Sequence, residues 1–157
     1  MAAPGEGKAA PAFALAAHPK GTIALKDYTG RQHVVLYFYP KDMTSGCTQE
    51  AASFQAHLEA FAKAGAVVLG VSPDDLASHA KFAGKQGLSF PLLSDTDAKV
   101  ATEYGVWKEK TMYGRKYMGV ERTTFVIDRT GKVRRIYPKV KVPGHAEAVL
   151  GFVQKLS

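Results

Sequence analysis

Residues 34–50 read Val-Val-Leu-Tyr-Phe-Tyr-Pro-Lys-Asp-Met-Thr-Ser-Gly-Cys-Thr-Gln-Glu, and this stretch decides the fold. Its first six residues are apolar and rich in β-forming types, as expected of a central strand that is covered on both faces. Pro40 ends the strand, because proline has no N–H to continue a hydrogen-bonded ladder. Beyond the loop, apolar residues recur at helical spacing, at Cys47, Ala51, Phe54, Leu58 and Phe61. The stretch therefore predicts a strand, a loop and a helix in succession.

The rest of the sequence continues this alternation of strands and helices. We expect strands over residues 22–25, 66–71 and 90–93, helices over 73–86, 95–104 and 146–156, and a hairpin with strands at 122–127 and 132–137. Ser72 is the expected cap of the helix that follows it, with Pro73 at the first helical position. Residues 107–120 are basic and aromatic, and we expect an irregular loop packed near the active site. This order predicts an α/β fold with parallel central strands and an antiparallel hairpin at the end, a thioredoxin-like pattern with additions.

The chain has 157 residues, which is the size of a single domain. Hydrophobic residues make up 46% and charged residues 22%, which is ordinary globular usage and excludes a disordered chain. No apolar run approaches the ~18 residues of a membrane-spanning helix, so we expect a soluble protein without membrane contact. We expect one domain over residues 1–157, in which about residues 1–10 form a loose arm.

Charge and cysteine usage limit the classes of partner and the compartment. Lysine plus arginine number 21 against 14 acidic residues, a net charge of +7, but the basic residues are scattered along the chain and indicate no specific nucleic-acid site. A single cysteine, Cys47, excludes an intramolecular disulfide and favours a reducing compartment. Residues 1–20 carry no secretory signal, so the cytoplasm is expected. The five histidines lie singly, without metal-ligand spacing, and we expect neither a metal nor a cofactor.

Cys47 lies where a strand, a loop and a helix meet. Either Thr44 or Ser45 can cap the helix, which makes Cys47 its third or its second residue. Both alternatives place the sulfur beside unpaired backbone N–H groups and the positive end of the helix dipole. Cysteines in such positions titrate at roughly 3.5–7.5 instead of about 8.5, so a reactive thiolate is predicted. The alternative is an inert cysteine on the apolar stripe of the helix, since free cysteine is often buried.

The neighbours of Cys47 carry a family resemblance. The pattern Pro40-x-x-x-Thr44-x-x-Cys47 is similar to the active-site pattern of the peroxiredoxins. The wider sequence resembles the bacterioferritin comigratory protein (PrxQ) subfamily, from about residue 11 to the C-terminus. The matching blocks are Tyr37-Phe-Tyr-Pro-Lys-Asp42, Gly46-Cys-Thr48, Glu50-Ala51, Gly70-Val-Ser72, Phe90-Pro-Leu-Leu-Ser-Asp95 and Arg122-x-Thr-Phe-Val-Ile-Asp128.

The resemblance implies a thioredoxin-like fold with a peroxiredoxin-type N-terminal extension, in which helices flank a central mixed sheet. It also implies a thiol peroxidase, an antioxidant enzyme that reduces hydrogen peroxide and organic hydroperoxides. In that reaction the thiolate of Cys47 attacks the peroxide and becomes a sulfenic acid. The hydroxyl of Thr44 is expected beside the sulfur, where it accepts from the peroxide and donates to the thiolate. Arg122 is expected to bring a permanent cation to the thiolate and to the leaving oxygen.

Three further residues have roles that the resemblance implies. Pro40 shapes the loop and shields the sulfur from water. The backbone N–H groups of Gly46 and Cys47 are expected to bind the peroxide, and glycine permits a close approach. Glu50 lies one turn farther along the helix and is expected to hold Arg122, although an acid in the first turn also suits the helix dipole by itself.

The sequence departs from the family where a second cysteine is expected. Many PrxQ-like proteins place a resolving cysteine five residues after the first or on the following helix, and the matching positions are Ala52 and Ala83. The chain is either a natural one-cysteine peroxidase or one in which a resolving cysteine was deliberately replaced. Because the chain has no second cysteine, the sulfenic acid must be reduced by an external thiol, such as thioredoxin, glutaredoxin or glutathione. A separate departure is Ser45, which stands where the family commonly has a proline. The resemblance implies a monomer. Two alternative functions are a thiol redox sensor and a basic nucleic-acid-binding module.

Overall fold

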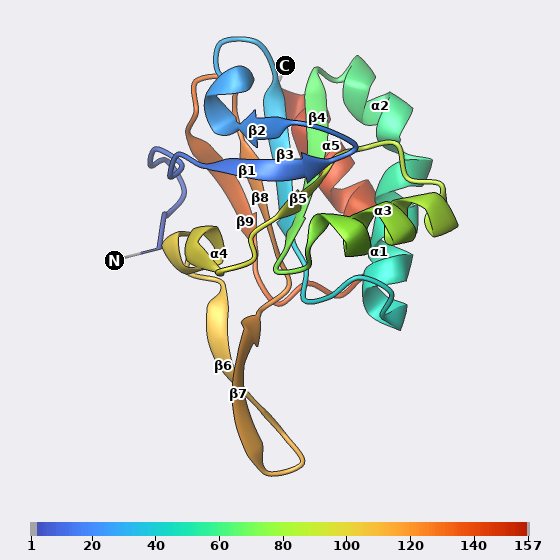
Figure 1. Cartoon of the computed structure of the whole chain (residues 1–157). Coiled ribbons are helices and arrows are strands. Elements are labelled where there is room, and N and C mark those ends of the chain that lie inside the picture. The colour runs from blue at the N-terminus through green and yellow to red at the C-terminus, as the bar shows by residue number, and fades with distance from the viewer. Residues whose placement is uncertain (1–2, 157) are drawn as a thin grey trace.

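Seven strands form one sheet in the order β2-β1-β5-β4-β3-β8-β9 in a computed structural model that describes residues 3–156 (Figure 1). The central strands β3, β4 and β5 are parallel, and the flanking pairs are antiparallel. The strands are β1 (Ala14–His18), β2 (Thr22–Ala24), β3 (His33–Phe38), β4 (Ala66–Ser72), β5 (Leu92–Ser94), β8 (Thr123–Ile127) and β9 (Val133–Tyr137). The predicted α/β fold with a central mixed sheet is confirmed.

Strand β3 is covered on both faces, as its unbroken apolar sequence predicts. Val34, Leu36 and Phe38 belong to the hydrophobic cluster on one face of the sheet. The alternate residues Val35 and Tyr37 belong to the cluster on the other face, together with the sulfur-bearing Cys47. Because successive side chains of a strand point to opposite faces, both clusters are built on the same strand.

The helices are divided between the two faces of the sheet (Figure 1). They are α1 (Ser45–Ala56), α2 (Leu58–Lys63), α3 (Leu76–Gln86), α4 (Lys99–Glu103), α5 (His145–Leu156) and a 3-10 turn, η1 (Leu25–Asp27). The helices α1, α2, α3 and α5 supply the cluster around Cys47, whereas α4 and η1 supply the other cluster. Within residues 3–156, no helix is both long and apolar enough to cross a lipid bilayer.

Three predicted helices differ in their boundaries, and the one expected over residues 95–104 is found only as α4 at Lys99–Glu103. The helix expected to run through Phe61 is broken at His57, which has φ −107° and ψ 7° and separates α1 from α2. Ser72 is not a helix cap, because it continues β4 and pairs with Ser94 of β5. The cap is Asp75, whose side chain accepts a hydrogen bond from the backbone N–H of Ser78 at 2.9 Å. Pairing with β5 thus extends β4 to Ser72, although serine is a good helix-capping residue.

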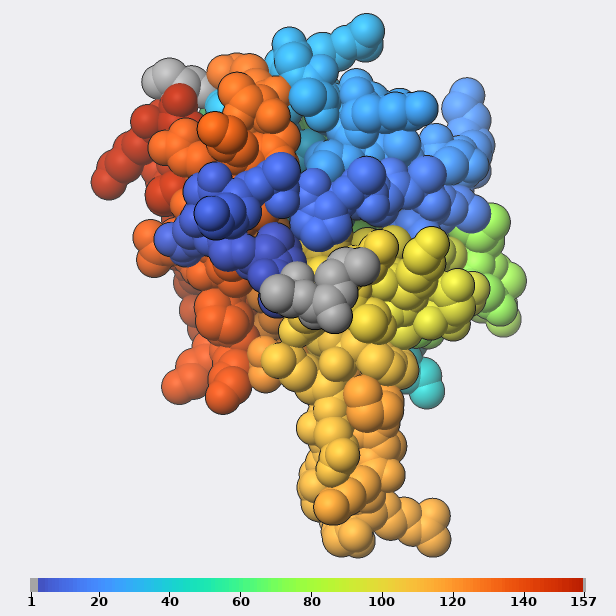
Figure 2. All heavy atoms as spheres, turned by 90° about the vertical axis from the view of Figure 1, so that its left-hand side faces the viewer, coloured from blue at the N-terminus to red at the C-terminus, as the bar shows by residue number. Residues whose placement is uncertain are grey.

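Residues 107–120 form a regular hairpin, so the prediction of an irregular loop is wrong. Strands β6 (Trp107–Met112) and β7 (Arg115–Val120) pair with each other in a separate two-stranded sheet. Their turn consists of Tyr113 and Gly114, with φ values of 53° and 76°. Positive φ at both central residues is the geometry of the tight turns that suit the twist of a hairpin. The hairpin projects from the body of the molecule as a narrow arm (Figure 2).

The N-terminal region contains a strand that the sequence did not predict. Strand β1 is rich in alanine, which has a weak strand preference, and it is fixed by pairing with β2 and β5. Residues 7–10, expected to belong to a loose arm, make hydrogen bonds to the edge of the sheet. The N–H of Gly7 donates to the carbonyl of Val133 at 2.7 Å, and the N–H of Val133 donates to the carbonyl of Lys8 at 2.8 Å.

Candidate active site

Cys47 lies in the first turn of α1, directly after the loop that follows β3. Thr44 is the N-cap residue, so the alternative in which Cys47 is the third helical residue is correct. The Cys47 side chain is only 1% exposed and packs in the cluster between the sheet and the helices. Within residues 3–156, the backbone N–H groups of Gly46 and Cys47 have no protein acceptor. These N–H groups and the helix dipole favour negative charge on the sulfur.

Arg122 brings a cation to this sulfur from the connection between β7 and β8. Its Nη2 lies 3.3 Å from the Sγ of Cys47, and its Nη1 donates to the Oε1 of Glu50 at 2.6 Å. The backbone of Arg122 is fixed because its carbonyl accepts from the N–H of Val140 at 3.0 Å. One guanidinium therefore bridges a sulfur and a carboxylate that lie one turn apart on α1.

The absence of a side chain at Gly46 makes this approach possible. A Cβ atom at Gly46 would lie 3.1 Å from the Nη2 of Arg122, which is closer than ordinary carbon contacts allow. The φ of Gly46 is not positive, so the requirement is for space and not for backbone conformation. The resemblance implied a close approach of the peroxide at this position, and the structure adds a close approach of the guanidinium.

Burial and charge act in opposite directions on the two ionisable partners. Burial raises the pKa of Glu50 to about 7, although the charge and hydrogen bond of Arg122 lower it. The second oxygen of this carboxyl group, Oε2, is buried without a hydrogen-bond partner. Burial lowers the pKa of Arg122, but Glu50 and Cys47 raise it by more, so it lies above its ordinary value. The guanidinium thus stays charged, while the carboxyl group changes its protonation near neutral pH.

Thr44 and Pro40 lie in the loop, and neither makes a hydrogen bond to the sulfur in the described part of the chain. The exposed hydroxyl of Thr44 donates to the carbonyl of Lys41 at 2.9 Å, and it makes no capping hydrogen bond. Pro40 is half-buried and follows the last residues of β3. Met43, between them, has a φ of 69°, which is strained for a residue with a side chain. Contacts with residues outside the loop must therefore hold Met43 in this conformation.

A buried ion pair that the sequence did not reveal holds this loop. Asp42 accepts from the hydroxyl of Tyr39 at 2.6 Å and from that of Ser78 at 2.8 Å. Its carboxylate also lies 2.7 Å from the Nδ1 of His79, whose Nε2 lies 3.0 Å from the carbonyl of Leu93. Both ring nitrogens thus lie within hydrogen-bond distance of an oxygen atom, one of them in a carboxylate. Burial raises the pKa of Asp42, but the hydrogen bonds from His79 and Tyr39 lower it below its usual value.

This pair connects the loop to the neighbouring helix and strand. His79 belongs to α3, and the carbonyl that it contacts belongs to β5. The backbone N–H of Asp42 also donates to the Oδ2 of Asp74, 2.7 Å away, in the segment between β4 and α3. Single histidines in a sequence are common, and 37 residues separate this one from its partner. Only the parallel order of β3, β4 and β5 brings the two side chains together.

The two positions that match a resolving cysteine have different surroundings. Ala52 is exposed on α1. Ala83 is only 4% exposed on α3, and it belongs to the same buried cluster as Cys47. Ala83, unlike Ala52, therefore lies in the same buried cluster as the sulfur of Cys47.

No group of three or more histidine, cysteine or acidic side chains within residues 3–156 is arranged to hold a metal ion. A hollow of about 550 Å³ lies beside β1, β2 and α4. Its lining includes Phe13 and Val100, which belong to the cluster on the face of the sheet opposite Cys47.

Comparison with known proteins assigns this arrangement to a family. The model of the AhpC/TSA family matches residues 7–136. Peroxiredoxin Bcp of Bacillus subtilis is 45% identical over 151 residues, which cover 96% of this chain and 96% of the relative. The chain is a peroxiredoxin of the AhpC/TSA family. Peroxiredoxins are thiol peroxidases, so the predicted enzyme class is confirmed.

Solved structures of the Bcp and PrxQ peroxiredoxins have the same fold. A cysteine-to-serine variant of PrxQ from Xylella fastidiosa is 41% identical, with a TM-score of 0.92 over 99% of this chain and 98% of that chain. The bacterioferritin comigratory protein of Xanthomonas campestris is 44% identical, with a TM-score of 0.86 over 91% of this chain and 90% of that chain. The resemblance to the PrxQ subfamily is confirmed by these matches.

Proposed function

We propose that this peroxiredoxin reduces hydrogen peroxide and alkyl hydroperoxides at the sulfur of Cys47. The observation that carries the proposal is the 3.3 Å contact between the Nη2 of Arg122 and the Sγ of Cys47. A guanidinium stabilises a thiolate more strongly than a neutral thiol, whose sulfur is only a weak acceptor. The same contact disfavours the alternative of an inert packing cysteine.

The peroxide reaction follows from the charges around the sulfur. The thiolate attacks one oxygen of the peroxide, the O–O bond breaks, and the hydroxyl group remains on the sulfur as a sulfenic acid. The leaving oxygen takes up one proton and departs as water or as an alcohol. The sulfur is oxidised by two electrons and the peroxide is reduced by two. Arg122 and the free N–H groups of Gly46 and Cys47 are suited to stabilise the charge that grows on the leaving oxygen.

The remaining predicted site residues have supporting roles in this proposal. Glu50 holds the guanidinium through the 2.6 Å contact to Nη1. Thr44 supplies a hydroxyl at the start of α1. This hydroxyl binds the peroxide once its hydrogen bond to the carbonyl of Lys41 is broken. Pro40 shields the sulfur from water where β3 ends.

The oxidised enzyme needs an external reductant, since the chain has one cysteine. A thiol attacks the sulfenic acid, releases water and forms a mixed disulfide with Cys47. A second thiol then attacks the sulfur of the reductant and releases the Cys47 thiolate. Thioredoxin, glutaredoxin and a small thiol such as glutathione are the candidate reductants, in a monomeric enzyme of the reducing cytoplasm.

The substrate range includes alkyl hydroperoxides in this proposal. The solved Xanthomonas campestris relative is described by its alkyl peroxide reduction activity and by its ligand complexes. That activity belongs to the relative, and its 44% identity with this chain supports the same substrate class here.

The test is a stopped-flow measurement of the peroxide reaction in wild type, Cys47→Ser and Arg122→Ala, with mass spectrometry of the sulfur product. Wild type should gain one oxygen atom at Cys47 and should turn over when a thiol is supplied. Cys47→Ser should lose at least about 10³-fold in rate, because the nucleophile is gone. Oxidation of Cys47 without catalytic turnover would instead identify a redox sensor.

A further inference from the structure

The β6–β7 hairpin has two faces of different chemistry. The pairing of Lys108 with Gly119, Lys110 with Tyr117 and Met112 with Arg115 places these side chains on one face. We define the cationic face as Lys108, Lys110, Met112, Arg115 and Tyr117. The opposite face carries Trp107, Glu109, Thr111, Lys116, Met118 and Val120.

Charge is unbalanced on the cationic face and balanced on the other. The cationic face has three basic side chains and no acid among its members. On the opposite face, Lys116 lies 3.7 Å from Glu109 and forms an ion pair with it. Only the cationic face is therefore left to attract an acidic surface.

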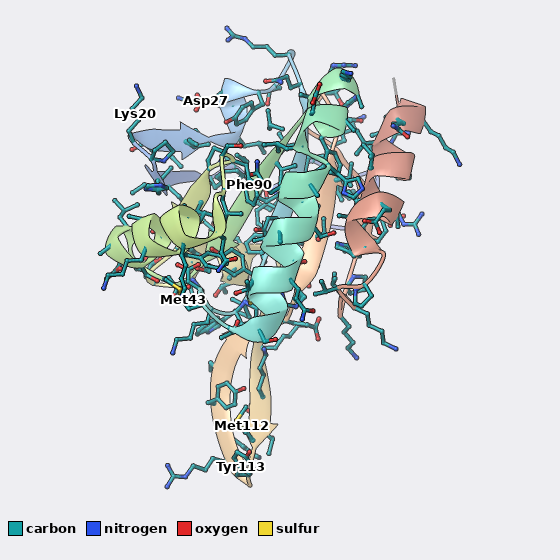
Figure 3. The ribbon with its side chains drawn as sticks, turned by 90° about the vertical axis from the view of Figure 1, so that its right-hand side faces the viewer. Lys20, Asp27, Met43, Phe90, Met112 and Tyr113 are labelled. Carbon is teal, nitrogen blue, oxygen red and sulfur yellow. The ribbon has the colours of Figure 1, made fainter. Side chains whose placement is uncertain are left out.

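The cationic face also exposes side chains that are typical of protein interfaces. Met112 is 54% exposed and Tyr117 is 43% exposed, and Tyr113 at the tip is 99% exposed. Tyrosine, methionine and arginine are enriched where proteins bind one another, and Met118 of the opposite face is also exposed, at 48%, so it is the charge that distinguishes the cationic face. Figure 3 shows Met112 and Tyr113 far out on the arm, with no other element beside them.

The hairpin is joined to the site through its chain, because Arg122 follows β7 directly after Glu121. Lys110 is half-buried, and its Cδ lies 3.3 Å from where a Cβ of Gly119 would be. Burial and the charge of Arg122 lower the pKa of Lys110, while Glu121 and Cys47 raise it. The hairpin and Met43 of the catalytic loop lie toward the same end of the molecule (Figure 3).

We propose that the cationic face is the docking surface for an acidic dithiol protein of the thioredoxin class, which reduces oxidised Cys47. The inference rests on the proposed function, because a chain with one cysteine must receive the reductant's sulfur at that cysteine. Arg115 pairs with Met112, four residues from Lys108, so the two cations lie about 14 Å apart along the hairpin and one carboxylate of a small thiol such as glutathione cannot contact both. A protein surface of ordinary interface size can.

The test compares two neighbouring charge reversals on opposite faces, Arg115→Glu and Lys116→Glu. Turnover of hydrogen peroxide is measured with an acidic thioredoxin, which is recycled by thioredoxin reductase and NADPH, and separately with dithiothreitol. Arg115→Glu should raise the KM for thioredoxin about tenfold, with less dependence on salt than wild type. Lys116→Glu should change this KM less than about twofold. Neither variant should change turnover with dithiothreitol or the stopped-flow rate of peroxide reduction.

The outcomes separate the inference from the proposed function. Failure of wild type to react with peroxide in the stopped-flow step would refute the function itself. Normal peroxide reduction with an equal thioredoxin KM in both variants would overturn only the docking surface. An Arg115→Glu effect that appears equally with glutathione would assign the face to small anionic thiols and overturn the proposal. Salt-sensitive binding of a single-stranded oligonucleotide that only Arg115→Glu abolishes, with an unchanged thioredoxin KM, would assign the face to nucleic acid and also overturn it.

Discussion

The Cys47 site and the β6–β7 hairpin use charge in opposite ways. Around Cys47, the ion pairs are buried and short, at 2.6 Å for Arg122–Glu50 and 2.7 Å for His79–Asp42. On the hairpin, the ion pair between Lys116 and Glu109 spans 3.7 Å between exposed side chains. Buried charges are held in place by packing, whereas exposed charges remain hydrated and free to meet a partner. The difference indicates that the first region is organised for chemistry and the second for contact.

The largest expected effect is the loss of the buried ion pair under the loop. His79→Ala should lower the free energy of unfolding by about 3–5 kcal/mol, because Asp42 is left buried without its counter-charge. Lys116→Ala, which removes the exposed pair on the hairpin, should cost about 0–1 kcal/mol. Urea denaturation of both variants gives the comparison. Equal losses would contradict the distinction between buried and exposed charge.

Arg122→Ala should slow the peroxide reaction about 10²–10³-fold, which corresponds to about 2.7–4 kcal/mol of transition-state stabilisation. The matched control is Arg134→Ala, since Arg134 also pairs with a carboxylate, at 3.3 Å from Asp128, but belongs to β9. Its peroxide rate should stay within about twofold of wild type. Stopped-flow kinetics measure both rates. An Arg122→Ala rate equal to wild type would remove Arg122 from the mechanism.

Glu50 should make stability depend on pH in a defined window. Its pKa is raised to about 7 in the folded state from 4.5, so the folded protein favours the protonated form. This contribution is complete below about pH 4.5 and is lost as the pH rises through about 7, by up to about 3 kcal/mol. Glu50→Gln, which stays neutral, should abolish this dependence in unfolding curves recorded between these pH values. A variant with the wild-type pH dependence would place the titrating group elsewhere.

The smallest effect is expected at the tip of the hairpin. Tyr113→Ser should change the free energy of unfolding by less than about 0.5 kcal/mol, because the side chain is 99% exposed. The peroxide rate should also be unchanged, since the residue lies far out on the arm (Figure 3). Thermal unfolding and stopped-flow kinetics provide the two measurements. A large stability loss would mean that the tip packs against the body.

The sequence predicted the parts of the fold that local patterns determine. The apolar run at residues 34–39 indicated a strand with two covered faces, and the spacing from Cys47 indicated the helix that follows it. The final hairpin and the helix at residues 146–156 were also correct to within about a residue. These elements have strong periodicity and clear turn residues, so tertiary packing did not override them.

Other features depend on contacts between distant segments. Strand β1 has an alanine-rich sequence and exists because two neighbours pair with it. The hairpin at residues 107–120 had a signal in Gly114, which permits the positive φ of a tight turn, but its basic and aromatic composition suggested a loop. The Asp42–His79 pair had no local signal, because it forms only across three parallel strands. Arg122, Glu50 and a contact between them were expected through the family resemblance, and the structure places the Nη1 of Arg122 2.6 Å from the Oε1 of Glu50.

The hydrogen atom that replaces a side chain at Gly46 gives a protein engineer a means of adjusting the reactivity of the neighbouring sulfur. The Cβ of an alanine there would lie 3.1 Å from the Nη2 of Arg122, which is closer than most carbon contacts. The positive charge would have to retreat by a few tenths of an ångström, without any change in the charged residues themselves. The strength of an electrostatic catalyst is thus set in this protein by the smallest residue in its neighbourhood.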